Sequence, residues 1–205
     1  GKMQKIILKY LNIGNAALLL IGITLCIVLA ADNYWIKDSY SYLGTYPRGR
    51  IPFTSLLIIL AVINGVFIFQ TIAAFERAYS SKIIPHSRMK SLRIIFTLDF
   101  ICLSIAGIIP MNQQLSFHTV GGILYFALYP FGIYIFSKIT QEINPKFSRI
   151  SRNISLLYSI GSIFFLLAFR SVVPVETFCI MLIAVWTFFL NRLVLNIFRS
   201  QKRVK

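Results

Sequence analysis

Long apolar stretches are the feature that most constrains this chain. A bilayer core about 30 Å thick is crossed by roughly 20 apolar residues of helix. Six stretches come close to that length, at residues 12–31, 51–75, 92–110, 117–136, 151–169 and 175–198. The residues between them are too few for a separate soluble domain. The sequence therefore predicts an all-α, polytopic integral membrane protein, with one domain over residues 1–205 built as a bundle of six transmembrane helices.

The lysines and arginines predict the orientation of this bundle. The chain has 21 Lys+Arg against 6 Asp+Glu, a net charge of +15. Lys and Arg in short connections stay on the cytoplasmic side of a membrane. The two tails and the second and fourth connections hold 17 of the cations, which leaves four on the other side: Lys37, Arg48, Arg50 and Arg170. We expect a multi-pass protein of the cell membrane with both termini in the cytoplasm.

The same distribution argues against nucleic acid as a partner. The cations are divided among four segments, and anionic headgroups beside them offer roughly 1 kcal/mol per cation. Aromatic residues are not interleaved with them, as stacking on single-stranded nucleic acid would require. Membrane lipids are the expected partners, and nothing in the sequence specifies a protein partner.

Metal and cofactor sites are not expected. His86 and His118 fall on opposite sides of the membrane, so they cannot share one ion, and a catalytic zinc commonly needs three protein ligands. Cys26, Cys102 and Cys179 lie in three different apolar stretches without paired spacing. These thiols are typical of small buried apolar groups.

Asp99 is the single carboxylate inside an apolar stretch. A charged group in the membrane is costly and normally faces the bundle interior. Gln70 and Asn64 lie on the preceding stretch, and antiparallel packing places Gln70 at a similar depth. We expect an intramembrane polar contact of Asp99 with Gln70 or Asn64, or a protonated Asp99. A structural contact is favoured over a proton relay.

Polar side chains gather in the external connections. The first of these, residues 32–50, combines Tyr and Trp with turn formers, a composition typical of the membrane interface. Alternatively, Asp38, Ser39 or Ser41 point inward over a cavity. His118 begins the fourth stretch, and two charged residues flank the last external turn. The candidate ligand-binding site is therefore a cluster at the outer end of the bundle, made of Asp38, Ser41, His118, Arg170 and Glu176.

Three short features carry a family resemblance. They are Ser41-x-x-Gly44 in the first external connection, Gly107-Ile-Ile-Pro110 followed by His118, and Glu176 at the start of the last stretch. In these the chain resembles an uncharacterised family of bacterial six-helix membrane proteins related to the DRAM-like superfamily, which includes the damage-regulated autophagy modulators and the GPI-lipid-remodelling factors. The resemblance implies six helices and an association with lipid handling. Tyr42 departs from the pattern, which has an acidic residue between the Ser and the Gly.

Three functions remain open from the sequence. The first is a non-enzymatic membrane protein that binds or handles a lipid or amphiphile in a polar pocket at the outer end. The second is an intramembrane lipid-modifying hydrolase or acyltransferase, with His118 as base, Ser41 or Ser116 as nucleophile, and Asp38 or Glu176 orienting the imidazole. No nucleophile motif such as G-x-S-x-G supports it. The third is the substrate-binding subunit of a transporter.

Overall fold

The computed structural model describes residues 2–79, 83–109, 111–169 and 171–203. Over these ranges the chain is helical and contains no strand, which confirms the all-α prediction. The helices are α1 (Lys2–Leu29), α2 (Arg50–Ala78), α3 (His86–Ile108), α4 (Leu115–Ile139), α5 (Pro145–Ala168) and α6 (Val173–Arg203), with two short 3₁₀ helices, η1 (Tyr34–Ile36) and η2 (Tyr40–Thr45).

The helices have the length and composition of membrane spans. Within the described residues, α2 to α6 are each long and apolar enough to cross a bilayer, and α1 contains a shorter apolar segment, Ala17–Leu29. The chain is thus compatible with a helical membrane bundle. Helix α5 begins at Pro145, six residues before the predicted stretch. Asn144 caps it by accepting the N–H of Phe147 at 2.9 Å, and proline fits the first turn, where its missing N–H has no helical partner.

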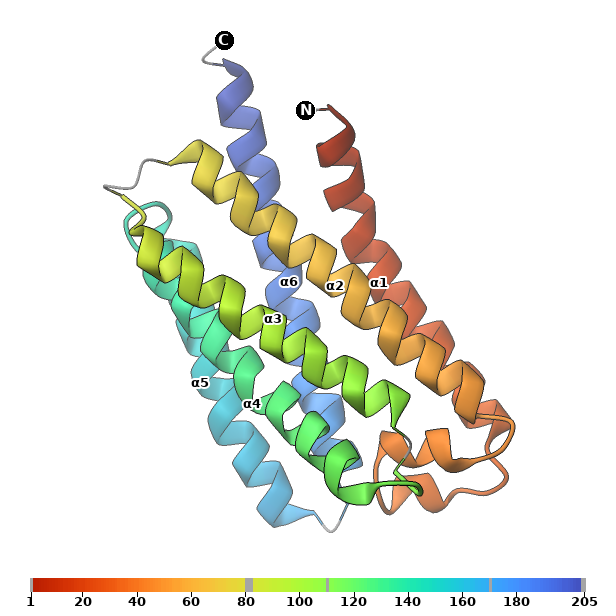
Figure 1. Cartoon of the computed structure of the whole chain (residues 1–205). Coiled ribbons are helices and arrows are strands. Elements are labelled where there is room, and N and C mark those ends of the chain that lie inside the picture. Colours follow the sequence, from red (N-terminus) through yellow and green to blue (C-terminus); the bar gives the residue numbers. More distant parts are fainter. Residues whose placement is uncertain (1, 80–82, 110, 170, 204–205) are drawn as a thin grey trace.

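Helices that follow one another in the chain pack side by side, and α6 returns to contact α1 and α2. The two termini lie at the same end of the bundle, together with the α2–α3 and α4–α5 connections (Figure 1). We call this end the terminal pole. The opposite end carries η1 and η2 and the α3–α4 and α5–α6 connections, and we call it the loop pole.

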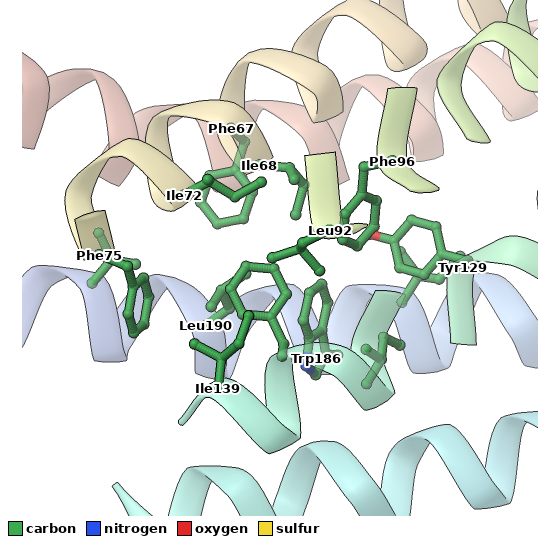
Figure 2. Packing of buried hydrophobic residues seen from close by; sticks show 14 of the residues in the cluster. Phe67, Ile68, Ile72, Phe75, Leu92, Phe96, Tyr129, Ile139, Trp186 and Leu190 are labelled. Carbon is green, nitrogen blue, oxygen red and sulfur yellow. The ribbon is translucent and has the colours of Figure 1, made fainter. Parts of the chain in front are cut away.

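A buried core of aromatic and aliphatic side chains packs the helices together (Figure 2). Trp186 of α6 is fully buried at its centre, with the rings of Phe136, Tyr129 and Phe96 at 5.4, 6.1 and 6.4 Å between centroids. The indole N–H donates to Ser151 Oγ of α5 at 3.0 Å. One indole therefore connects α3, α4, α5 and α6.

The first connection of the loop pole folds as a compact lid, which we define as residues 32–49. Leu43 and Tyr46 of the lid form a small core with Cys26 and Phe53, which belong to α1 and α2. Gly44 lies against this core, where a Cβ would be only 2.7 Å from a ring carbon of Phe53. The aromatic segment is therefore an ordered cover over the bundle.

The described chain forms no hydrogen bond between Asp99 and Gln70 or Asn64. Asp99 is fully buried, and neither carboxylate oxygen has a hydrogen-bond partner within the described parts of the chain. The amide of Asn64 instead bonds to Asn15 of α1 at 2.9 Å and to the Leu60 carbonyl at 2.8 Å. Asn64 thus faces α1. Asp99 lies about one turn along α3 from Phe96, whose ring packs on Tyr129 and Phe136 of α4. A protonated Asp99 stays a prediction.

Candidate functional site

Hydrogen bonds tie the lid to the beginning of α6. The backbone N–H of Tyr40 donates to Glu176 Oε2 at 2.7 Å, and the Tyr40 hydroxyl lies 3.1 Å from that of Thr177. The N–H of Val172 donates to the Asp38 carbonyl at 2.8 Å. Ser171 adds a bond from its hydroxyl to the Ile36 carbonyl. These bonds bring Asp38 and Glu176, which are far apart in the sequence, to one place.

A cavity of about 630 Å³ lies beneath the lid among α4, α5 and α6, and we call it the α5-side cavity. Four of the five predicted site residues line it: Asp38, Ser41, His118 and Glu176. Ser39, named as an alternative inward-pointing residue, also lies on its wall and is buried. The fifth predicted residue, Arg170, lies outside the described residues. The structure therefore gathers the described part of the predicted cluster around one space, and its role in binding stays a prediction.

His118 borders this cavity in a defined orientation. Its Nδ1 lies 2.8 Å from the Ile109 carbonyl oxygen. A carbonyl only accepts hydrogen bonds, so Nδ1 carries a proton in this contact. Within the described residues, no hydrogen bond joins His118 to a serine hydroxyl or to a carboxylate. The arrangement required for a hydrolase, with a hydroxyl nucleophile on Nε2 and a carboxylate on Nδ1, is thus not assembled.

The sequence did not predict a second cavity, of about 370 Å³, which lies beneath the lid on the side of α1. Side chains of α1, α2, α3, α4 and α6 line it, and we call it the α1-side cavity. The hydrogen-bonded pair Asn15 and Asn64 lies on its wall. Gly122 of α4 also lies on its wall, where an added Cβ would meet no atom within 4 Å. The glycine was one signal of this space in the sequence of α4, because it leaves room beside the helix.

The two cavities share part of their walls. Ser41 of the lid, Gly122 and Phe126 of α4, and Glu176 of α6 line both. Glu176 is buried, with only 8% of its surface exposed, and it lies in the first turn of α6. A helix N-terminus favours a carboxylate, because the free N–H groups and the helix dipole present positive partial charge. The fold thus holds an acidic group where the two spaces meet.

The remaining walls of both cavities are mainly apolar side chains. The hydroxyls of Ser159 and Ser162 also border the α5-side cavity, but they donate to carbonyls of their own helix. No lysine or arginine lines either cavity in the part of the chain that the structure describes. Such walls accommodate hydrocarbon, and the carboxyl groups of Asp38 and Glu176 lie beside the lid.

Among the described residues, no group of three or more His, Cys, Asp or Glu side chains could hold a metal ion. Comparisons of the chain with protein-family models, with curated proteins and with solved structures found no match. The geometry of the two cavities and the lid therefore carries the functional argument.

Proposed function

We propose that this protein is a non-enzymatic cell-membrane protein that binds the hydrocarbon chain of a lipid or other amphiphile in the α5-side cavity. The polar end of the ligand lies under the lid, beside Asp38, Ser41, His118 and Glu176. The observation that carries the proposal is an apolar cavity of about 630 Å³ whose acidic and imidazole groups gather at one end. Ligand pockets in proteins commonly have volumes of about 300–1,000 Å³ and a few convergent polar groups.

The proposal includes a topology. The chain crosses the membrane six times, with both termini in the cytoplasm and the lid on the outer face. Five spans and the apolar segment of α1 support the number of crossings. Both termini lie at one pole (Figure 1), and the tails and connections of that pole hold most of the cations. The ligand then enters from the outer leaflet.

Filling the α5-side cavity tests the proposal. Ala127 of α4 lines only this cavity, and its side chain is exposed, so Ala127→Phe adds volume there without entering the packed core. The probe is 1-oleoylglycerol, a single-chain uncharged amphiphile, counted on the purified protein by native mass spectrometry. We expect the affinity to fall by roughly tenfold or more, equivalent to about 1.4 kcal/mol.

Ala168→Phe is the matched control, because Ala168 is an exposed residue of α5 that lines neither cavity. It should bind the probe as the unmodified protein does. Equal binding of 1-oleoylglycerol by the unmodified protein, Ala168→Phe and Ala127→Phe would overturn the proposed site.

A further inference from the structure

The two cavities adjoin each other and share part of their walls, and we call each one a branch. Each is apolar along most of its wall, and each reaches Ser41 and Glu176 at its lid end. Phe126 of α4 lies on both walls. Two apolar branches that leave one polar junction match the shape of an amphiphile with two hydrocarbon chains joined at one headgroup.

The two branches also have different neighbours. Of the helices that line them, only the α5-side branch contacts α5, and only the α1-side branch contacts α1, α2 and α3. Their volumes, about 630 and 370 Å³, each fall in the range of ligand pockets, which is about 300–1,000 Å³. Each branch is therefore large enough to be a subsite of its own, and neither is a small irregularity of packing.

The junction presents hydrogen-bond acceptors and two carboxyl groups. Glu176 Oε2 accepts the Tyr40 N–H at 2.7 Å, and no hydrogen bond to Oε1 is formed in the described chain. Asp38 adds a second carboxylate on the α5-side wall, and the described lining residues provide no lysine or arginine to neutralise the pair. Acceptors in a desolvated site need donors, and like charges brought together there are unfavourable. A complementary headgroup carries hydroxyl or ammonium donors and lacks a terminal phosphate.

From this geometry we infer the ligand class: a two-chain lipid that places one chain in each cavity and a donor-bearing, uncharged or cationic headgroup at Ser41 and Glu176. The inference rests on the proposed function, which concerns the α5-side cavity alone, and extends it to a second subsite. The α1-side cavity then determines the preference for two chains over one, and Glu176 determines the preference among headgroups.

A matched pair of cavity-filling variants tests the second subsite. Ala184 of α6 is exposed and lines only the α1-side cavity, as Ala127 lines only the α5-side cavity. The probes are 1,2-dioleoylglycerol and 1-oleoylglycerol, which share a chain and an uncharged headgroup. Ala184→Phe should lower the affinity for 1,2-dioleoylglycerol by roughly tenfold, while the ratio of affinities for the two probes moves toward one.

The two proposals fail in different ways. If Ala127→Phe weakens 1-oleoylglycerol binding but Ala184→Phe leaves the preference for two chains unchanged, the second subsite is wrong and the proposed function stands. If Ala127→Phe has no effect on 1-oleoylglycerol, the proposed function fails as well. A measurement on the unmodified protein avoids dependence on folded variants: binding of 1,2-dioleoylglycerol should exclude 1-oleoylglycerol, and a complex that carries one molecule of each would contradict a two-chain site.

Charge at the junction is tested with headgroups. The unmodified protein should bind 1,2-dioleoylglycerol at least about tenfold more tightly than dioleoyl phosphatidic acid, because the phosphate meets two carboxylates. Glu176→Gln keeps an acceptor for the Tyr40 N–H and removes the charge, so this ratio should fall several-fold. Preferential binding of phosphatidic acid by the unmodified protein, or an unchanged ratio in Glu176→Gln, would overturn the headgroup assignment.

Discussion

The packed core and the cavity walls are built from the same helices but differ in how those helices meet. In the core, α6 buries Trp186 completely among rings of α3 and α4 (Figure 2). Two residues further along, on the opposite face of the same helix, Phe188 is 46% exposed and lines the α1-side cavity. The packed core therefore holds the helices together, whereas the cavity walls contribute less to stability and leave space for a ligand.

Truncating one aromatic residue of the core and one of a cavity wall gives the largest expected contrast. Trp186→Ala removes the central ring of the core and the hydrogen bond to Ser151, and should cost about 3–5 kcal/mol in the free energy of unfolding. Phe188→Ala, on the opposite face of the same helix, should cost less than about 1 kcal/mol, because its ring is partly exposed. Unfolding in mixed micelles titrated with a denaturing detergent measures both. Similar losses in the two variants would show that the core and the cavity walls do not differ in this way.

Two glycines of α4 sharpen the contrast at the level of one methyl group. A Cβ at Gly132 would lie 2.5 Å from Phe96 Cζ, and the Phe96 ring is itself fully buried between Tyr129 and Trp186. Gly132→Ala should therefore destabilise the protein by about 1–3 kcal/mol through overpacking.

At Gly122 the added methyl group meets open space. Gly122→Ala should leave stability unchanged or raise it by up to about 1 kcal/mol, because alanine favours the helix. The same micelle titration compares the two variants. A loss in Gly122→Ala as large as that in Gly132→Ala would mean that the cavities close in solution.

Hydropathy predicted the helical elements well, because a segment of about 20 apolar residues has few alternatives to a helix in a membrane. It missed the first turns of α5, where Lys146 and Ser148 are polar but follow the Asn144 cap and Pro145. The gathering of Asp38, Ser41, His118 and Glu176 was predictable in part, since alternate connections of a helical bundle lie at the same end.

The sequence could not predict which faces of the helices meet. A membrane helix is apolar around most of its circumference, so periodicity gives little information about its rotation. Asn64 was therefore assigned to Asp99, although it bonds to Asn15 of α1. The α1-side cavity depends on the same unknown, because its wall combines residues from five helices.

The smallest expected effect concerns the lid that lies over the two cavities. The Tyr46 hydroxyl donates to the Asp32 carboxylate, and this bond, with the N–H of Tyr34, holds the pKa of Asp32 below its usual range. Burial, reinforced by the bond to Asp32, raises the pKa of Tyr46 to about 12. Asp32 thus stabilises the lid above its unfolded-state pKa, and the contribution is lost as the pH falls through the lowered folded-state value. Tyr46 stabilises it below its unfolded-state pKa, and that contribution is lost as the pH rises toward about 12.

Iodide quenching of tryptophan fluorescence can follow the lid separately from the core. The chain has two tryptophans: Trp35 lies in the lid and is partly exposed, whereas Trp186 is fully buried. Quenching should therefore report on Trp35, whose ring stacks on Tyr40 at 5.7 Å. It should increase as the pH falls below about 4, where an aspartate in an unfolded chain begins to take up its proton. In Tyr46→Phe, which lacks the hydroxyl donor, quenching should already be higher at neutral pH and depend less on pH. An identical pH profile in the two proteins would show that the other contacts of the lid hold it in place, so that covering of the cavities would not depend on the bond between Asp32 and Tyr46.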